Sequence, residues 1–288
     1  MRQIDTATRL CAVIGNPVEH SLSPLIHNAA FEATGLNYVY VAFHVEDVAG
    51  CLTGMRALPS FRGMSVTIPH KRAVMDYLDE IEPMAQHVGS VNTITNYEGR
   101  LIGATTDGPG TLRAFADADV DLRGKRVLFV GSGGAVRAVA FAMAELAHVS
   151  EITILGRTES KVTALVDDLQ SKTECEVRGR RLEQDLPSAM ASHDIVIQGT
   201  SVGMHPHPGE TCVPRELFRA GQVAFDMVYR PSRTRFIQDA EAAGCQTIPG
   251  VEMLINQAVL QFERWTGVPA PRNIMRDALV AELVKAVP

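Results

Sequence analysis

Lys71 is the residue of this sequence with the clearest capacity for chemistry, because it stands between a strand and a helix. In Ser65–Lys71 (Ser-Val-Thr-Ile-Pro-His-Lys) an alternating, β-branched run ends at Pro69, which lacks the N–H that a central strand needs. The polar–apolar pattern of residues 71–78 then predicts a helix. Lys71 is therefore expected at a strand-to-helix corner, where side chains commonly point into a cleft, although this stretch alone favours an ordinary surface charge.

Two serines near the N-terminus form a second candidate site. A helix is predicted from Leu25 to Thr34, with Ser23 as its N-cap and Pro24 at its first position. Ser21 lies in the preceding loop and has no evident capping role. Two hydroxyl groups at a helix N-terminus also suit a small anion such as a carboxylate, and for Ser23 capping and anion binding are compatible.

A glycine-rich turn in the middle of the chain predicts a dinucleotide site. The compact apolar strand of residues 125–130 leads directly into Gly131-Ser-Gly133-Gly134, and a helix is predicted from Ala135 to about Leu146. Glycines there let the backbone approach a pyrophosphate, and the helix N-terminus supplies N–H groups. The sixth position of the usual G-x-G-x-x-G pattern is Val136, so the interpretation depends on the strand–turn–helix context, and the alternative is a mere tight turn.

The next predicted strand, residues 152–155, distinguishes between cofactors. Enzymes that use NAD usually place an acid at its end to hold the ribose 2′-hydroxyl. Here Arg157 and Thr158 follow Gly156, and Lys161 comes one turn into the next helix. Two cations and a hydroxyl suit a 2′-phosphate, so NADP is predicted rather than NAD. The nearby Glu159 argues the other way, and an ordinary solvated helix start is the alternative.

The remaining pattern predicts two domains of α/β type. Strands and helices alternate through the first part of the chain, and a hairpin is predicted at residues 91–106. We place a domain boundary where Gly103–Gly110 interrupts the pattern. The first domain comprises residues 1–107 and 250–288, because two helices, at 253–265 and 273–287, follow a complete dinucleotide domain at 108–249. That domain is predicted to have about six strands, the others being 176–179, 194–198, 223–227 and 246–248.

Composition excludes several functional classes. The net charge of −6 favours neither a nucleic-acid partner nor an anionic membrane surface, and no apolar run is long enough to span a bilayer. The N-terminal residues include an acid and lack a long apolar segment, so no secretory signal is predicted. Five scattered cysteines without a C-x-x-C pair predict reduced thiols in a cytoplasmic enzyme. No metal site is predicted, since His205 and His207 lack an evident third ligand.

With these segments placed, the chain from Gly15 to Gly267 resembles the shikimate dehydrogenase family. The motifs that carry the resemblance are Gly15–Pro24 with His27 and Asn28, Val66–Lys71, Gly89–Thr93, Thr106–Gly108, Gly131–Arg137, Arg157-Thr158, Thr200–Met204, Asp226–Tyr229, Met253–Ala258 and Trp265–Gly267. The resemblance implies an α/β substrate-binding domain, a Rossmann NADP-binding domain and an active site in the cleft between them. It also implies reversible hydride transfer between NADPH and the ring ketone of 3-dehydroshikimate, and a homodimer is a fair expectation for the family.

The resemblance assigns roles residue by residue. Lys71 and Asp107 match the family's catalytic pair. The matching substrate contacts are Ser21 and Ser23 for the carboxylate and Thr67, Asn92, Asp107 and Gln257 for the ring hydroxyls, with Tyr229 also near the substrate. The expected cofactor contacts are Gly131, Gly133, Gly134, Ala135, Arg157, Thr158, Lys161, Thr200, Met204 and Gly250. For Met204, packing in the core is an equally good interpretation, and Gln257 could equally face solvent.

Hydride delivery to a ketone builds negative charge on oxygen, which explains why a lysine and an aspartate suit the reaction. A neighbouring carboxylate favours the charged form of a lysine. We therefore expect Lys71 to act first as an ammonium group that stabilises the developing alkoxide. Asp107, water or Lys71 itself then completes the proton transfer, and the sequence does not separate these routes.

The chain departs from the family's usual pattern at several positions. Ser65 and Thr105 each stand where asparagine is usual, Gly156 stands before Arg157-Thr158 in place of asparagine, and Gln198-Gly199 replaces Asn-Ala. Ser65 and Thr105 lie beside the expected substrate contacts. The alternatives are therefore a divergent paralogue that oxidises quinate or a related ring acid, and a non-catalytic NADP(H)-binding regulator. The intact Lys71 and Asp107 argue against the regulator.

Overall fold

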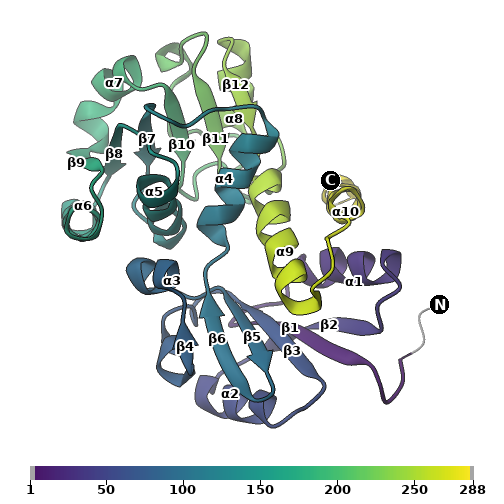
Figure 1. Ribbon diagram of the computed structural model, residues 1–288. Helices are drawn as coiled ribbons and strands as arrows, with labels where there is room; N and C mark the ends of the chain where they lie inside the picture. Colours follow the sequence, from purple (N-terminus) through teal and green to yellow (C-terminus); the bar gives the residue numbers. More distant parts are fainter. Residues whose placement is uncertain (1–3, 286–288) are drawn as a thin grey trace. The chain divides into compact units, whose positions relative to one another are not determined.

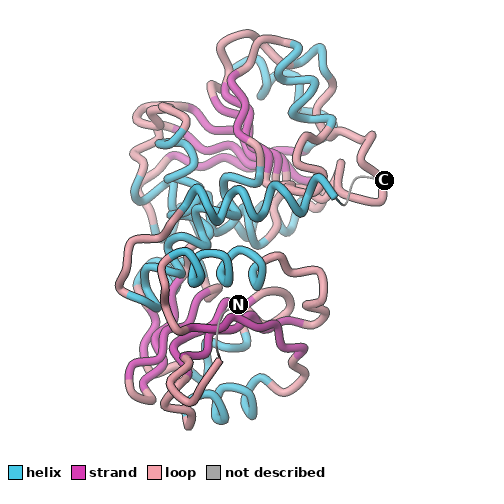
Figure 2. Tube along the Cα trace, turned by 90° about the vertical axis from the view of Figure 1, so that its right-hand side faces the viewer, coloured by secondary structure: helices cyan, strands magenta, loops and turns pink. Residues whose placement is uncertain are grey.

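The computed structural model describes residues 4–285 and divides into two compact units. Unit 1 comprises the chain up to Thr106 together with Ile255–Lys285, and unit 2 comprises Asp107–Leu254. Each unit contains one six-stranded sheet flanked by helices (Figures 1 and 2). The mixed α/β class predicted from the alternating pattern is confirmed.

Unit 1 contains a mixed sheet with strand order β2-β1-β3-β5-β6-β4. Its strands are β1 Arg9–Gly15, β2 Tyr38–His44, β3 Phe61–Val66, β4 Glu80–Ile81, β5 Thr93–Tyr97 and β6 Arg100–Ala104. Strand β1 runs parallel to β2 and β3, whereas β5 is antiparallel to β3 and β6. The predicted hairpin between β5 and β6 is confirmed, and its turn places Glu98 and Gly99 at positive φ.

Burial explains why unit 1 is a sheet covered by helices. Cys11 to Ile14 of β1 are all buried, as expected for an inner parallel strand covered on both faces. The helices of unit 1 are α1 Ser23–Ala33, α2 Val48–Arg56, the 3₁₀ helix η1 Ala73–Tyr77, α3 Pro83–Val88, α10 Arg272–Lys285 and the part of α9 (Gly250–Thr266) from Ile255 onward. Phe262 and Trp265 of α9 are buried, as their helical spacing predicts. The last residues of the predicted final helix, 286 and 287, lie outside the described residues.

Three local predictions for this part of the chain are wrong. Ser23 is the first residue of α1 rather than its N-cap, because the backbone of Leu22 is already helical. Residues 71–78 do not form an α-helix, and only the short 3₁₀ helix η1 is present. The segment Gly103–Gly110 is not a simple break, since β6 continues to Ala104 and helix α4 begins at Asp107.

Close packing explains how α4 tolerates Gly108. A Cβ at Gly108 would lie 2.5 Å from the Cβ of Ala142 and 2.6 Å from the carbonyl oxygen of Ala138. Glycine therefore lets α4 approach α5 closely, and the contact offsets the low helix propensity of Gly108. Pro109 stands in the first turn, where its missing N–H removes no helical hydrogen bond.

Unit 2 contains a parallel sheet with order β12-β11-β10-β7-β8-β9, and the predicted six strands are confirmed. The strands are β7 Arg126–Val130, β8 Glu151–Gly156, β9 Glu176–Arg181, β10 Ile195–Gln198, β11 Val223–Asp226 and β12 Gln246–Ile248. The helices are α4 Asp107–Asp117, α5 Gly134–Leu146, α6 Glu159–Lys172, α7 Leu182–Ser192, the 3₁₀ helix η2 Arg215–Leu217, α8 Arg235–Ala242 and the start of α9. The order reverses between β7 and β10, which is where such sheets bind ligands.

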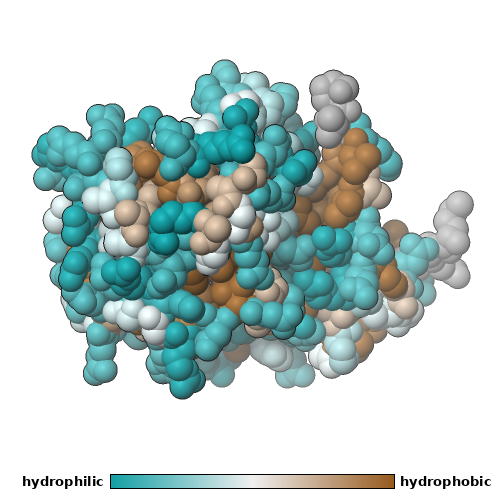
Figure 3. Space-filling model, turned by 90° about the horizontal axis from the view of Figure 1, so that it is seen from above, coloured by the Kyte–Doolittle hydropathy of each residue, from teal (hydrophilic) through white to brown (hydrophobic). Residues whose placement is uncertain are grey.

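The outer surface carries the mixture of side chains usual for a globular protein. On the face shown in Figure 3 most residues are hydrophilic, and the hydrophobic ones form separate patches. Among the described residues, no helix is long and apolar enough to cross a membrane. All five cysteines are free thiols, as predicted.

Candidate active site

Main-chain hydrogen bonds fix the corner that carries Lys71. Thr67 N donates to the carbonyl oxygen of Ile14 over 2.9 Å, and His70 N donates to that of Thr67 over 3.0 Å. The carbonyl oxygen of Lys71 accepts from Val91 N over 2.9 Å, which ties the corner to the segment before β5. Lys71 is partly buried, so it is not the fully exposed charge that its local sequence favours. The corner is thus anchored to two neighbouring segments of unit 1.

Thr67 approaches the loop after β1 so closely that this loop needs a glycine. A Cβ on Gly15 would lie 2.5 Å from Thr67 Cγ2, and 3.2 Å from the carbonyl oxygen of Ile68. Asn16 N also donates to that carbonyl oxygen over 3.1 Å. The glycine therefore lets the loop carrying Ser21 and Ser23 leave the sheet beside Thr67.

Ser21, rather than Ser23, accepts a hydrogen bond from a main-chain N–H at the start of α1, which differs from the prediction that Ser23 is the N-cap. Ser21 Oγ accepts a hydrogen bond from Ser23 N over 3.3 Å, so Ser21 is the serine that meets a free N–H at the start of α1. Ser23 is 9% exposed, and the N-cap position of α1 is occupied by Leu22. Both hydroxyl groups lie at the N-terminal end of α1, where the helix favours negative charge.

Asn92 and Thr106 form a buried pair next to Asp107. Thr106 N donates to Asn92 Oδ1 over 2.8 Å, and Asn92 Nδ2 donates to Thr106 Oγ1 over 3.1 Å. Asp107 follows as the first residue of α4 and is 8% exposed. Gln257 on α9 is also buried, so the alternative interpretation that it faces solvent is wrong.

In unit 2 the predicted cofactor residues gather at the carboxyl ends of the parallel strands. Gly131 follows β7 with φ of +121°, and a Cβ there would lie 2.8 Å from the carbonyl oxygen of Gly199, which follows β10. At Gly133 and Gly134 a Cβ would meet no atom within 4 Å. Packing within the protein does not require these two glycines, so their bare backbone at the start of α5 fits the close approach of a pyrophosphate.

The cationic residues predicted for a 2′-phosphate lie at the end of β8. Arg157, Thr158 and Lys161 are exposed. Thr158 is the N-cap residue of α6, although its side chain makes no capping hydrogen bond. This end of the strand therefore presents two cations and a hydroxyl group to solvent, as the sequence predicts.

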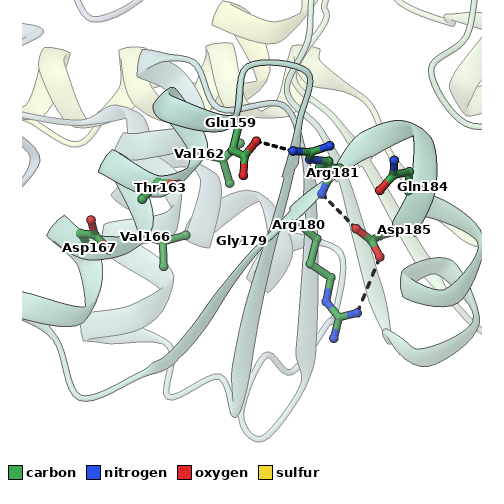
Figure 4. A pocket seen from close by; sticks show the side chains of 10 residues that line it. All are labelled: Glu159, Val162, Thr163, Val166, Asp167, Gly179, Arg180, Arg181, Gln184 and Asp185. Carbon is green, nitrogen blue, oxygen red and sulfur yellow. Dashed lines mark hydrogen bonds and ion pairs between the residues drawn. The ribbon is translucent and has the colours of Figure 1, made fainter.

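The structure adds Arg181, which sequence reasoning missed. It ends the edge strand β9 and pairs in register with Gly156 of β8. Its guanidinium group donates to Glu159 Oε2 over 2.6 Å (Figure 4). Glu159, the acid that argued against NADP, is thus paired with a cation from the neighbouring strand. Only the alignment of β8 with β9 reveals that pair.

The pocket in Figure 4 has a volume of about 420 Å³ and is lined by residues of α6, β9 and α7. Its two arginines are paired with acids, Arg180 with Asp185 and Arg181 with Glu159. None of the residues predicted for the active site lines it. We therefore do not identify this pocket with the active site.

The other predicted residues of unit 2 follow β10 and β11. Gln198 is fully buried, and its Oε1 accepts from both the N–H and the hydroxyl of Thr200, which fixes the loop after β10. Met204 in that loop is 43% exposed, so the alternative interpretation that it packs in the core is wrong. Tyr229 follows β11, and burial raises the pKa of its hydroxyl. At Gly250 a Cβ would lie 2.5 Å from the carbonyl oxygen of Val228, so glycine is needed where α9 begins.

Asp226, at the end of β11, is fully buried. It accepts hydrogen bonds from Thr234 Oγ1 and from Val228 N. Burial nevertheless raises the pKa of its carboxyl to about 6, with the two hydrogen bonds acting in the opposite direction. Asp226 therefore couples the stability of the fold to pH.

We expect Asp226→Asn to remove part of the pH dependence of the free energy of unfolding. The pKa in the folded protein exceeds the value of about 3.9 in an unfolded chain, so the folded state holds the proton more tightly. The resulting stability, about 3 kcal/mol, is fully present below about pH 4 and is lost as pH rises through about 6. Urea unfolding from pH 4 to 8 measures it. Parallel curves for the wild-type protein and the variant would contradict this account.

Comparison with known proteins connects these features to one family. Three sequence profiles match the chain: the shikimate dehydrogenase substrate binding domain at residues 13–94, shikimate/quinate 5-dehydrogenase at residues 114–207, and the shikimate 5′-dehydrogenase C-terminal domain at residues 250–280. The chain is 43% identical over 289 residues to the shikimate dehydrogenase (NADP(+)) of Moorella thermoacetica. That alignment covers 99% of this chain and 97% of the relative.

Solved structures show the same likeness over nearly the whole length. Shikimate 5-dehydrogenase from Listeria monocytogenes, in complex with shikimate and NAD, has a TM-score of 0.92 at 37% identity, covering 97% of this chain and 99% of that one. The Thermus thermophilus enzyme, in complex with NADP(H) and shikimate, has a TM-score of 0.85 at 36% identity, covering 95% and 99%.

Proposed function

This chain belongs to the shikimate dehydrogenase family, and we propose that it catalyses the reversible, NADP-dependent interconversion of shikimate and 3-dehydroshikimate. The observation that carries the proposal is the match over 99% of the chain to a relative named for this activity. The anchored corner at Lys71 and the bare glycine turn of unit 2 supply the local chemistry. Ser65 keeps open the alternative of quinate or a related ring acid as the preferred substrate.

In this proposal unit 1 binds the substrate and unit 2 binds the cofactor. Ser21 and Ser23 hold the carboxylate at the N-terminal end of α1, where the helix dipole favours an anion. Thr67, Asn92 and Gln257 contact the ring hydroxyls. Tyr229 lies near the substrate and belongs to unit 2.

Lys71 and Asp107 form the catalytic pair. When hydride reaches the ring ketone, negative charge develops on its oxygen, and the Lys71 ammonium stabilises that charge. The proton that completes the alcohol comes from Lys71, Asp107 or water, and in the reverse direction the same groups accept it. The main-chain bonds to Thr67, His70 and Val91 keep the lysine in place for this role.

NADPH, when bound, supplies the hydride. Gly131, Gly133, Gly134 and Ala135 line the turn that approaches its pyrophosphate, and Arg157 with Thr158 and Lys161 binds the 2′-phosphate. Thr200, Met204 and Gly250 complete the cofactor contacts. The loop of Thr200 is held by the buried amide of Gln198.

Cytoplasmic location and dimerisation belong to the same proposal. Five free thiols suit a reducing compartment. A homodimer is the expected assembly, and light scattering of the purified protein would measure it directly.

The deciding assay follows reduction of NADP by the purified protein with shikimate. We expect turnover with shikimate and NADP, slower turnover with NAD, and little with quinate. Absence of turnover with shikimate would overturn the proposal. A larger kcat/KM for quinate than for shikimate would instead select the alternative substrate.

Glu159→Gln is expected to improve NADP binding. The substitution removes a negative charge near the proposed 2′-phosphate site and releases Arg181 from its ion pair. Both groups are well exposed, so screening by solvent limits the gain to about 2- to 5-fold in KM for NADP, with less change for NAD. Asp167→Asn, an exposed acid farther along α6, is the matched control. A higher KM for NADP in Glu159→Gln would contradict this role.

A further inference from the structure

A chain of buried polar side chains crosses unit 1 and ends at Asn92. Its members are Tyr40 on β2, Ser65 on β3, Gln261 on α9, Thr93 on β5 and Asn92 itself, and none is more than 7% exposed. Burying polar side chains lowers the stability of a fold unless each one is hydrogen-bonded. The hydrogen bonds among these five side chains therefore constrain how each of them is oriented. Only Asn92 among them is a proposed substrate contact.

Helix α9 packs closely on the sheet, and this packing places Gln261 among the buried polar side chains. Trp265, one turn later on the helix, donates from Nε1 to the carbonyl oxygen of Ile94 over 3.0 Å. A Cβ on Gly63 of β3 would lie 2.2 Å from the same nitrogen, so glycine is required for the helix to come this near. Gln261 therefore lies against β3 and β5 without a layer of other side chains between them.

A main-chain group fixes the orientation of the Asn92 carboxamide. Thr106 N donates to Asn92 over 2.8 Å, and because an N–H can only donate, the atom it meets must be the amide oxygen. Thr93 Oγ1 donates to the same oxygen over 2.8 Å, whereas its alternative partner, Thr106 Oγ1, is 3.2 Å away. The nitrogen of Asn92 is consequently turned toward acceptors such as Thr106 Oγ1.

A second main-chain group fixes Gln261. Its Nε2 lies 2.9 Å from Thr93 Oγ1 and 3.4 Å from the backbone carbonyl oxygen of Asn92, which can only accept. Its Oε1 therefore faces Ser65, whose hydroxyl donates to it over 2.9 Å. Ser65 Oγ in turn accepts from Tyr40 over 2.7 Å. Every hydrogen bond in the chain thus runs in one direction, from Tyr40 to Asn92.

We propose that Gln261, supported by Ser65 and Tyr40, is a positioning residue that holds the Asn92 carboxamide as a hydrogen-bond donor to a ring oxygen of the substrate. The inference rests on the proposed function, because it takes Asn92 as a substrate contact. Without the Gln261 N–H, the Thr93 hydroxyl loses the amide donor that holds it, and it can turn its own proton from Asn92 to Thr106 Oγ1, which is 3.2 Å away. The Asn92 amide then loses one of the bonds that oppose its rotation.

The surroundings keep the chain of side chains uncharged. His27 stacks on the Tyr40 ring at 4.5 Å between centroids, and burial lowers the pKa of His27 to about 3. Burial also raises the pKa of the Tyr40 hydroxyl well above its usual value. Ser65 stands where the family usually has asparagine. Its hydroxyl accepts a hydrogen bond from the neutral Tyr40 hydroxyl and donates one to the Gln261 amide, so it connects these two groups.

Steady-state kinetics of Gln261→Met and Thr93→Val test the proposal, because both substitutions keep the volume nearly unchanged. For each variant we expect KM for shikimate to rise about 10-fold, the equivalent of one or two hydrogen bonds, while kcat stays within about 3-fold. KM for NADP should stay unchanged. In an Asn92→Ala background, Gln261→Met should cause no further rise in KM for shikimate, since its effect acts through Asn92.

Gln222→Met provides the matched control, because Gln222 is equally buried but lies in unit 2 and donates to the carbonyl oxygens of Met190 and His193. We expect it to lower the melting temperature without changing KM for shikimate. An unchanged KM in Gln261→Met, or an equal rise with and without Asn92, would overturn the inference. Inactivity of the wild-type protein with shikimate would instead overturn the proposed function, so the two failures are distinguishable.

Discussion

Lys71→Met is expected to lower kcat for shikimate by about 10³-fold while leaving NADP binding intact. The substitution keeps most of the side-chain length but removes the ammonium group. Loss of a preorganised charge beside a developing alkoxide typically costs about 10²- to 10³-fold, and loss of a proton donor or acceptor adds to that. Stopped-flow kinetics give kcat, and titration of protein fluorescence with NADPH gives the affinity for the cofactor.

Arg72→Ala is the control for Lys71→Met, because it removes a neighbouring, exposed positive charge. We expect its kcat to remain within about 2-fold of wild type, as usual for a surface substitution. If Lys71→Met kept full activity, the catalytic role of the lysine would be wrong. If both variants lost activity equally, general charge rather than a positioned ammonium would explain the loss.

Arg157→Ala should reverse much of the preference for NADP over NAD. A guanidinium that binds a phosphate contributes a charge-assisted hydrogen bond, so kcat/KM for NADP is expected to fall roughly 10- to 100-fold. With NAD, which lacks the 2′-phosphate, the change should stay within about 3-fold. Initial rates with each cofactor at saturating shikimate provide the comparison.

Arg178→Ala tests whether any arginine of this region has the same effect. Arg178 lies on β9, two residues before Arg180, and pairs with Glu176. We expect no change in the ratio of kcat/KM values for the two cofactors. Equal losses with NADP and NAD in Arg157→Ala would contradict a contact with the 2′-phosphate.

Where local pattern and burial agree, the sequence predicted the fold well. The parallel strands β7 and β8 are largely apolar, with a glycine directly after β7 and at the end of β8, and their pattern needs no long-range information. The glycine turn after β7 is recognisable for the same reason, since only glycine tolerates that backbone path. The short strand β4, the helix α4 and the 3₁₀ geometry of η1 were missed, because each depends on its neighbours more than on its own residues.

For the candidate site, residue types in the sequence indicate which chemical groups are available. Which of these groups contact one another depends on distances in the folded structure. Lys71, Ser21, Ser23 and Arg157 attract attention from sequence because cations and hydroxyl groups at strand and helix ends suit anions. Their roles in binding and catalysis stay predictions for the assays above. The pairing of Glu159 with Arg181 follows only from the alignment of β8 with β9.

The sequence by itself determined the class of the fold, the glycine-rich turn after β7 and the family, because these depend on short motifs whose order along the chain is informative. Only the tertiary structure decided what surrounds Lys71 and Asn92. Lys71 opens no α-helix, and its corner is held by hydrogen bonds from Val91 and to Ile14. Ser65 and Gln261, 196 residues apart, meet because a glycine in β3 admits α9 to the sheet. No local pattern encodes such a contact, since its energy depends on both partners being in place.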